Sequence, residues 1–341
     1  MKTRFFLTFV LSALLAIPCS ADIPKFRAAA FTDDGVLYLI APDGEEQILS
    51  DSVELTESGL MAAPICLSGN MVFYIDPSDV WRAIDFKGNR VSLFDKNEYP
   101  FCYDEETEIP YPPISAGGRF YLPDNSDGPV VWGCVDNTGK VVIPFDYSIC
   151  NVSDDLVVMG GKEGGEKDEP LFIDKTTQKV ICKPDVNIMS YSYFSEGLIW
   201  VYKDVEGEAY GGFVDKQGKT VVPFKYDMSY SSKFVNGRAK VMNYEGQCFY
   251  VDRQGNETLI DDDTAGESEN TYPILSLDDD ERYVFQDENG KVLFTCDYSE
   301  GYFKNGYCPV MLDEKWGFID KTGKLVVPCK YTFVTSFESV D

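Results

Sequence analysis

The 341-residue chain contains no histidine, and this absence removes most of the familiar catalytic chemistry. Ser-His and Cys-His nucleophile pairs, the usual zinc sites and imidazole acid-base catalysis all depend on that side chain. The 57 Asp and Glu residues leave one enzymatic alternative, a glycoside hydrolase that uses two carboxylates. Because no spacing singles out a carboxylate pair, we expect no catalytic residues.

Two acidic stretches contain the oxygen donors that Ca²⁺ prefers. Residues 124–128 read DNSDG, and residues 278–281 read DDDE. Neither stretch has the ligand spacing of a known calcium loop. We therefore interpret both as solvated turns, and we expect no metal ion, no other cofactor and no specific stabilisation by Ca²⁺.

Aromatic side chains form the other class that could make specific contacts, with a glycan or with a protein. Some of them recur at equivalent positions and are expected to be core residues: Trp132, Tyr147, Tyr226, Trp316 and Tyr331. Four others do not recur and lie in an insertion within residues 96–113: Tyr99, Phe101, Tyr103 and Tyr111. Because repeat scaffolds place specificity in such loops, these four residues are the predicted contact site.

The stretch Trp316–Tyr331, which reads WGFIDKTGKLVVPCKY, shows which element would position any such site. Its two β-branched and aromatic runs flank a turn and predict a β-hairpin. Asp320 can accept hydrogen bonds from the turn, and Gly323 supplies the positive φ that this turn requires. Pro328 lacks an N–H group, so the second strand should end or reach a sheet edge there.

The same D-x-x-G turn recurs along the chain. Full copies begin at Asp85, Asp136, Asp215, Asp252, Asp287 and Asp320. Looser copies are 41–44, which lacks the leading Asp, and 174–177, where Gln178 replaces the expected Gly. These eight turns are mostly 33 to 44 residues apart. A period of this size indicates stacked or radially arranged repeat units.

Each unit has a further strand ahead of the hairpin, as in residues 197–201, 237–241 and 306–311. A phenylalanine commonly precedes the leading glycine of that strand by three residues, which gives the pattern F-x-x-G. The simplest folding of one unit is a three-stranded antiparallel meander. The residues assigned to the repeat framework are Trp132, Gly133, Asp136, Gly139, Asp215, Gly218, Asp252, Gly255, Asp287, Gly290, Trp316, Gly317, Asp320 and Gly323.

These residues resemble the WG repeat family, a bacterial β-repeat named for its Trp-Gly pair. The full pair occurs at Trp132-Gly133 and Trp316-Gly317. Other copies depart from it: Trp81-Arg82, Gly211-Gly212, Cys248-Phe249 and Tyr283-Val284. The resemblance covers nearly all of the chain after residue 21. It implies a repeated β architecture in an exported or surface protein, with no catalytic residues to carry over.

The two ends of the repeat array are complementary. Residues 27–35 match residues 238–246 and read as the first strand of a unit, whereas residues 337–341 read as the F-x-x segment that precedes such a strand. We therefore expect a closed, propeller-like ring in which strand 27–32 pairs with the final unit, near residues 325–331 or the segment ending at Phe337. An open β-solenoid is the alternative.

The N-terminus predicts export. Residues 1–21 contain a short basic start, an apolar run and small residues, which is the layout of a secretory signal cleaved before Asp22. Lipidation of Cys19 is the alternative to simple cleavage. No other apolar run is long enough to span a bilayer. Residues 22–341 would then be a single WG-type β-repeat domain, located in the periplasm, at the cell surface or outside the cell.

Charge and cysteine content narrow the partners. The formal net charge of −27 becomes −29 when the two basic residues of the signal are removed. Such acidity opposes nucleic acid and anionic lipid and would attract a basic partner, although it is also compatible with a role in solubility alone. Nine cysteines remain after the signal, an odd number that leaves at least one unpaired. Several replace apolar strand residues of other copies, such as Cys182 and Cys329, and we interpret these as buried free thiols, with a Cys134–Cys150 disulfide as a possible bridge.

The sequence therefore predicts an all-β repeat protein of about eight units that acts as an exported, non-catalytic module, as a monomer, and binds a protein or a glycan. The identity of that ligand is not encoded in any motif. A hydrolase that uses paired carboxylates is the alternative function. It would require a cleft with two carboxyl groups of strongly perturbed pKa.

Overall fold

A computed structural model describes the fold of these residues: 26–56, 64–96, 99, 102, 111–126, 129–153, 155–162, 170–190, 192–230, 232–260, 273–278 and 281–340. Within them the chain forms 28 strands and one short helix, α1 (Ser92–Lys96). The prediction of an almost entirely β repeat protein is confirmed. Residues 1–25 lie outside the described part, so the signal peptide and the role of Cys19 stay predictions.

The strands form eight consecutive antiparallel units, whose successive strands we call A, B and C; a short strand before strand A is called the inner strand. Unit 1 comprises β1 (Phe26–Phe31), β2 (Leu37–Ile40) and β3 (Glu46–Ser50), and unit 2 comprises β4 (Ile65–Ser68), β5 (Met71–Ile75) and β6 (Trp81–Asp85). Unit 3 comprises β7 (Ile114–Ala116), β8 (Arg119–Asp124), β9 (Val131–Asp136) and the first half of β10 (Val141–Val152). Unit 4 comprises the second half of β10, β11 (Leu156–Lys162), β12 (Leu171–Asp174) and β13 (Val180–Cys182). Unit 5 comprises β14 (Phe194–Ser195), β15 (Leu198–Val205), β16 (Glu208–Asp215) and β17 (Thr220–Asp227). Unit 6 comprises β18 (Arg238–Met242), β19 (Cys248–Asp252) and β20 (Glu257–Leu259), and unit 7 comprises β21 (Ile274–Leu277), β22 (Tyr283–Gln286) and β23 (Val292–Cys296). Unit 8 comprises β24 (Tyr307–Leu312), β25 (Lys315–Asp320) and β26 (Leu325–Tyr331).

The inner strand extends the predicted three-stranded meander. In unit 5 the F-x-x-G segment itself pairs with strand A, through Phe194 opposite Ile199 and Ser195 opposite Leu198. Strand β4, strand β7 and the second half of β10 are the inner strands of units 2, 3 and 4. In unit 2, β5 is therefore strand A and β6 is strand B. The segment that the sequence pattern indicates as a connection is therefore a structural strand.

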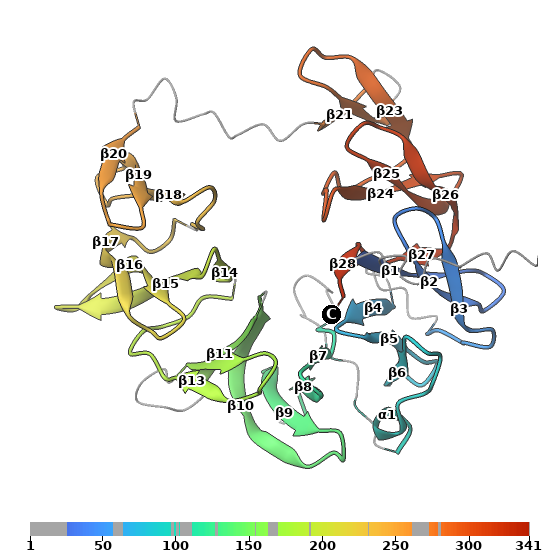
Figure 1. The fold of residues 1–341 in the computed structure, drawn as a ribbon, viewed down its shortest axis with the longest axis horizontal. Helices are drawn as coiled ribbons and strands as arrows, with labels where there is room; N and C mark the ends of the chain where they lie inside the picture. Colours follow the sequence, from blue (N-terminus) through green and yellow to red (C-terminus); the bar gives the residue numbers. More distant parts are fainter. Residues whose placement is uncertain are drawn as a thin grey trace, which may run out of the picture.

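The units are arranged around a common centre. In Figure 1 the inner strands lie toward the middle and strands C lie at the periphery, as in a propeller. Units 6 and 7 stand apart in this view. Residues 261–272, which follow unit 6 in the sequence, lie outside the described part. Complete closure of the ring at this point stays a prediction.

The predicted pairing between the two ends of the array is confirmed. Strand β1 pairs with β27 (Phe333–Val334) and β28 (Glu338–Ser339), and the amide of Thr335 donates to the carbonyl of Ala29. The partner differs from the nearest expectation in one respect. The tail after β26 joins the sheet of unit 1 as its inner strand, whereas β1 does not extend the sheet of unit 8.

The hydrophobic core is divided among the contacts between units. Seven clusters of buried residues join units 1 and 2, 2 and 3, 3 and 4, 4 and 5, 5 and 6, 7 and 8, and 8 and 1. No cluster of described residues joins units 6 and 7. Between units 8 and 1, the small side chains of Ala28 and Ala30 are fully buried against Phe318, Tyr331 and Phe337. The alanine-rich start of the chain is thus explained by close packing on aromatic rings.

The D-x-x-G turns form as predicted. In unit 8 the Asp320 carboxylate accepts hydrogen bonds from the amides of Thr322 and Lys324, and the Gly323 amide donates to the Asp320 carbonyl. Gly323 has a φ of 80°, which only glycine adopts without strain. In the looser copy, Gln178 takes the left-handed position with a φ of 58°.

The glycine of the Trp-Gly pair has a separate role. A Cβ atom on Gly317 would lie 2.5 Å from the carbonyl oxygen of Val327 and 2.7 Å from the amide nitrogen of Cys329. Strand C arches over this glycine at Pro328, and the pairing register shifts between Trp316 and Phe318. Units 3 and 5 show the same shift over their glycines. In unit 7 Val284 replaces the glycine, and the register there does not shift.

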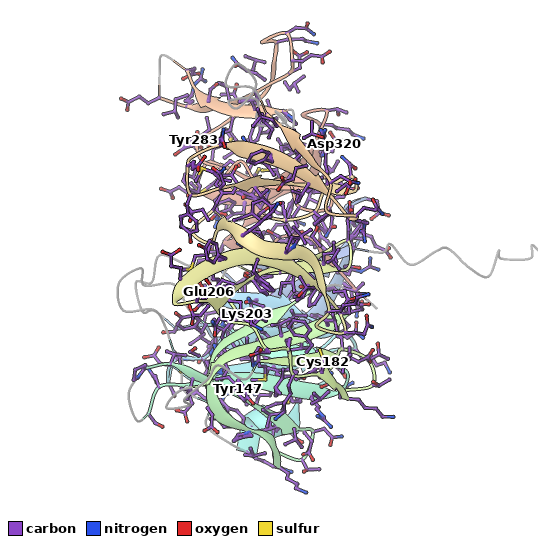
Figure 2. All side chains as sticks on the ribbon, turned by 90° about the vertical axis from the view of Figure 1, so that its left-hand side faces the viewer. Tyr147, Cys182, Lys203, Glu206, Tyr283 and Asp320 are labelled. Atoms are coloured by element: carbon purple, nitrogen blue, oxygen red, sulfur yellow. The ribbon has the colours of Figure 1, made fainter. Side chains whose placement is uncertain are left out.

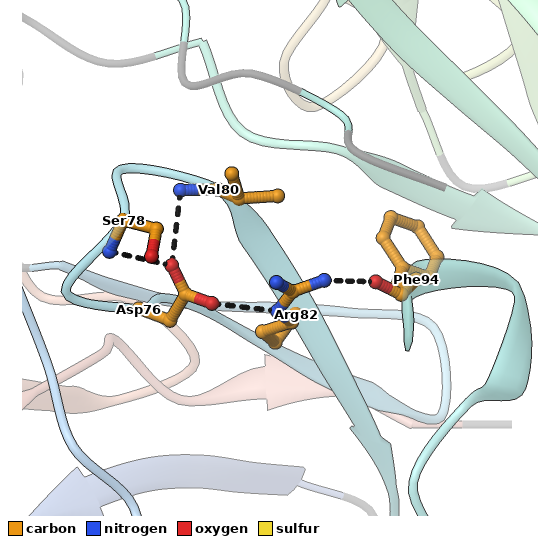
Figure 3. A network of polar contacts seen from close by, with 5 residues as sticks. All are labelled: Asp76, Ser78, Val80, Arg82 and Phe94. Carbon is orange, nitrogen blue, oxygen red and sulfur yellow. Dashed lines mark hydrogen bonds and ion pairs between the residues drawn. The ribbon is translucent and has the colours of Figure 1, made fainter. Parts of the chain in front are cut away.

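Unit 2 shows what replaces this arch when the glycine is absent. Arg82 stands at the glycine position, and its guanidinium donates to the carbonyl of Phe94 in α1 (Figure 3). The Arg82 Nε atom also lies 2.7 Å from the Asp76 carboxylate, which accepts the amides of Ser78 and Val80. The arginine therefore fixes α1 where other units continue strand C.

The described cysteines are all free, so the disulfide alternative does not form. Cys134 and Cys150 are buried in the cluster between units 3 and 4, where they pack as small apolar groups. Burial raises the pKa of the Cys134 thiol to about 12. These thiols therefore stay protonated at neutral pH.

Candidate binding face

The connections between strands A and B lie on one face of the molecule, which we call the A–B face. Figure 2 shows the opposition of the two faces, with Glu206 and Tyr283 toward one side and Cys182 and Asp320 toward the other. Carboxylates occur in or beside the A–B connections of seven units: Asp33, Asp34, Asp76, Asp79, Asp124, Glu206, Glu245, Asp278, Glu281, Asp313 and Glu314. The connection of unit 4 lies outside the described part.

The opposite face has a different charge. There the leading aspartates of the turns are accompanied by lysines, such as Lys140, Lys219 and Lys324, which directly follow the turn glycines. Opposite charges therefore alternate on this face, whereas the A–B face is mainly acidic. A charged partner would distinguish the two faces by their electrostatic potential.

An open pocket of about 690 Å³ lies on the A–B face between units 1 and 2. Its lining residues come from the A–B connection of unit 1, the segment after β3 and the turn of unit 2: Phe31, Asp33, Asp34, Gly35, Ser52, Val53, Glu54, Leu55 and Pro77. The volume lies within the range of small-ligand sites, roughly 300–1,000 Å³. The pocket combines an apolar wall with three carboxylates.

The segment 52–56 holds the pocket together by crossing from unit 1 to unit 2. The Val53 amide donates to the Gly35 carbonyl at 3.0 Å, and the Thr56 amide donates to the Ile75 carbonyl at 3.0 Å. The Thr56 hydroxyl also donates to Asp79 at 2.7 Å. Gly35 has a φ of 82°, and a Cβ atom there would lie 3.0 Å from the Val53 carbonyl oxygen, so this close approach requires glycine.

Only one of the three carboxylates is paired with a described basic residue. The Lys315 ammonium of unit 8 and the Thr332 hydroxyl both bind the Asp33 carboxylate. The hydrogen bond from Lys315, followed by that from Thr332, lowers the pKa of Asp33 below its ordinary value. Asp34 accepts the Thr32 hydroxyl at 2.5 Å, and Glu54 has no hydrogen-bond partner in the described part of the chain.

The predicted contact site is only partly described. Tyr99 packs on Phe94 with ring centroids 5.2 Å apart, and Tyr111 packs edge-on against Trp132 at 6.2 Å. Both tyrosines are half-buried and belong to separate clusters, so the structure does not bring them together. Phe101 and Tyr103 lie outside the described residues. The contact role of this insertion stays a prediction.

The recurring aromatics are core residues, as predicted: Trp132, Tyr147, Tyr226 and Tyr331 are buried, and Trp316 is half-buried. Sequence reasoning missed what their polar ends do. The Tyr331 hydroxyl donates to Glu46 of unit 1 at 2.7 Å, and the Lys330 ammonium lies 2.7 Å from the same carboxylate. We call this arrangement the glutamate latch.

The latch occurs a second time, between units 5 and 6. There Glu257 accepts the Tyr226 hydroxyl and lies 2.8 Å from the Lys225 ammonium. A signal for it exists in the sequence, because Lys-Tyr ends strand C of one copy and Glu occurs two residues after the turn glycine of the next. The contact between units 8 and 1, which are at opposite ends of the array, therefore has the same structure as the contact between the consecutive units 5 and 6.

The predicted calcium stretches contain no described metal site. Asp124 accepts the Ser126 amide, and Asp278 is paired with Arg282 at 2.8 Å. The remaining acidic residues of both stretches lie partly outside the described residues. Among the described residues, no group of three Cys, Asp or Glu side chains is positioned to hold a metal ion.

The resolved pKa shifts of the described carboxyl groups all have one direction. Every described carboxyl group whose pKa departs from the ordinary value departs downward: Asp33, Glu46, Asp85, Asp136, Asp174, Glu196, Asp252, Glu257 and Asp320. The general acid of a glycoside hydrolase requires a raised pKa instead. Of the pocket carboxylates, Asp33 belongs to this set.

Solved structures that resemble this chain share little with it in detail. BamB from Moraxella catarrhalis is 15% identical over 77% of this chain and 80% of that chain, with a TM-score of 0.32. The dihydro-heme d1 dehydrogenase NirN is 12% identical over 94% and 76%, with a TM-score of 0.43. TolB from Acinetobacter baumannii is 11% identical over 68% and 62%, with a TM-score of 0.26. No curated protein sequence matches the chain.

Within the described residues, no helix has the length and apolar character needed to cross a membrane. The family described as "WG containing repeat" matches four stretches: 132–155, 212–245, 285–316 and 316–339. These stretches contain the Trp-Gly pairs and the arched C strands of units 3, 5 and 8. Their spacing matches the repeat that the fold displays. The chain therefore belongs to the WG-repeat family.

Proposed function

We propose that this protein is a non-catalytic binding module that presents its A–B face to a partner protein. The observation that carries the proposal is the open pocket of about 690 Å³ between units 1 and 2. Its position on a framework of paired strands keeps the pocket residues in fixed places, as binding sites on repeat scaffolds require. The glycan alternative has less support, because four of the five recurring aromatics are buried in the core and the fifth, Trp316, is half-buried.

We also propose that the protein acts after export. The basic start, apolar run and small residues of positions 1–21 support this location. Mass spectrometry of the protein purified from its own host tests it. A mature N-terminus at Asp22 is the expected result, and a chain that retains Met1 to Ala21 would contradict export by cleavage.

Site-specific photo-crosslinking tests the binding function. A photoreactive amino acid placed at Ser52, on the pocket rim, should form one adduct with a host protein in intact cells. An excess of unlabelled protein should abolish that adduct. The matched control is the same amino acid at Lys321, in an exposed turn of the opposite face. Adducts of equal yield at both positions, or none at Ser52, would rule out the A–B face as the binding face.

A further inference from the structure

The pocket between units 1 and 2 has a composition that selects the chemistry of its occupant. We infer that it receives an arginine or lysine side chain from a basic segment of the partner protein. This inference rests on the proposed function, because it names the class of partner that the A–B face binds. Three properties of the pocket carry it: unbalanced charge, an apolar wall and acidic surroundings.

The pocket has more negative than positive charge. Lys315 is committed to Asp33, whereas Asp34 and Glu54 have no basic partner in the described part of the chain. Two carboxylates at one pocket repel each other, and a cation placed between them relieves that repulsion. A guanidinium group can donate hydrogen bonds to both carboxylates at once through its several N–H groups.

The apolar wall distinguishes a side chain from a bare ion. Phe31 and Val53 are buried in the wall, and Leu55 and Pro77 complete the lining. A metal ion would leave this apolar surface in contact with water. The methylene stem of arginine or lysine covers apolar surface while its charged end reaches the carboxylates. The pocket therefore fits a long, cationic side chain.

The surroundings favour a polypeptide over a free amine. Asp79 lies in the A–B connection of unit 2, near Pro77, and Asp313 and Glu314 lie in that of unit 8, beside Lys315. A basic segment can contact these neighbouring connections while one of its side chains enters the pocket. A small amine can occupy only the pocket, so it lacks the gain from simultaneous contacts.

Binding of an oligoarginine peptide tests the inference. The double variant Asp34→Asn, Glu54→Gln removes both unpaired charges with little change in shape. Its affinity for the peptide should fall about tenfold, because two ion pairs are lost. The matched control is Glu45→Gln, Glu288→Gln, which removes two exposed carboxylates from the opposite face and should leave the affinity within about twofold. Spermidine should bind both variants and the original protein weakly.

Amide chemical shifts locate the peptide. Addition of oligoarginine should shift the resonances of Gly35 and Val53 more than those of Gly139 and Gly323. Equal losses of affinity in the two double variants, or shifts centred on the opposite face, would overturn the pocket as a receptor for cationic side chains. If either of these results were found together with an adduct at Ser52, the pocket inference would fail but the proposed function would remain supported. Peptide binding at the pocket without any Ser52 adduct would refute the proposed function alone.

Discussion

The contact between units 8 and 1 and the gap between units 6 and 7 occupy equivalent places in the repeat. Units 8 and 1 share a buried cluster, a glutamate latch and the pairing of β1 with β27 and β28. No described residue of unit 6 shares a buried cluster with unit 7. Units 8 and 1, which are not consecutive in the chain, are thus joined by packing, strand pairing and a latch, whereas the described residues of the consecutive units 6 and 7 share no buried cluster.

The difference follows from the C strands. In unit 8 the arch over Gly317 carries Lys330 and Tyr331 to the position where they reach Glu46 of the next unit. Strand C of unit 6 ends at Leu259 without an arch or a Lys-Tyr pair, and position 292 of unit 7 is a valine where the latch would need a glutamate. A latch therefore needs three features at once: the glycine, the Lys-Tyr pair and the acceptor.

The largest effect is expected from Phe337→Ala. This ring is fully buried against Tyr307 and Phe318, so its removal should lower the free energy of unfolding by about 3–5 kcal/mol. The matched variant is Phe303→Ala, whose ring is only half-buried at the equivalent position ahead of unit 8. Denaturant unfolding measures both. A loss for Phe303→Ala equal to that for Phe337→Ala would show that the buried Phe337 stabilises the contact between units 8 and 1 no more than Phe303 stabilises the contact between units 7 and 8.

Gly317→Ala should come next. The added methyl group meets backbone atoms of the arch, so we expect a loss of about 1–3 kcal/mol and a displaced Tyr331. The control is Gly306→Ala, where a Cβ atom would meet no atom within 4 Å but φ is 90°. A fluorotyrosine introduced at position 331 and observed by ¹⁹F NMR separates the two variants, because only Gly317→Ala should shift its signal. An unchanged signal would contradict the role given to the arch.

Glu46→Gln should cost about 1 kcal/mol, because a partly exposed ion pair with Lys330 is lost while the tyrosine hydroxyl can still donate to the amide oxygen. A double-mutant cycle with Lys330→Met measures the coupling. The same cycle on Glu257 and Lys225 should give a similar value. A coupling near zero at both places would show that the packing of the clusters, and not the latch, joins the units.

Acid should weaken the latch. Burial opposes ionisation of Glu46, but hydrogen bonds from Lys330 and Tyr331 outweigh burial and lower its pKa below the ordinary 4.5. A lowered folded-state pKa stabilises the fold above the unfolded-state value, and this contribution is lost as the pH falls through the folded-state value. The Tm difference between the original protein and Glu46→Gln should therefore shrink from pH 7 to about pH 3. A difference that stays constant would contradict this assignment.

The smallest energetic effect, but the sharpest comparison, is expected from spin labels. Labels at Asp43 and Lys321 span units 1 and 8, and labels at Gln254 and Glu288 span units 6 and 7 in similar turns. The first pair should give a narrow distance distribution, since packing and a latch fix it. The second pair should give a broader one. Two equally narrow distributions would show that the ring closes between units 6 and 7 as well.

Much of the fold could be predicted from the sequence, because the turns carry local chemistry. Seven of the eight turns have a leading aspartate that accepts amides, and all eight have a residue of positive φ; both features are visible as residue types. The pairing of β1 with the last segment follows from the complementary ends of the array. Helix α1 could not be predicted, because it depends on Arg82 reaching Phe94 from another element.

The candidate site was harder to predict, because its residues are not neighbours in the sequence. Asp33, Glu54 and Pro77 each look like ordinary turn or loop residues and are brought together only by the crossing of segment 52–56. The insertion with Tyr99 and Tyr111 attracts attention because its aromatics do not recur, yet their rings pack into the core. Exposure depends on tertiary contacts that residue type alone does not reveal.

The pairing of β28 with β1 has a consequence for how the chain can be connected. In unit 5, Ser195 and Leu198 face each other across the turn Glu196-Gly197, and Glu338 and Arg27 face each other in the same way across Ser339 and Phe26. Ser339 and Phe26 thus occupy the positions that the turn residues Glu196 and Gly197 occupy in unit 5. The same ring of units can therefore be written as a circular permutant, joined through a short turn at this point and opened between β20 and β21.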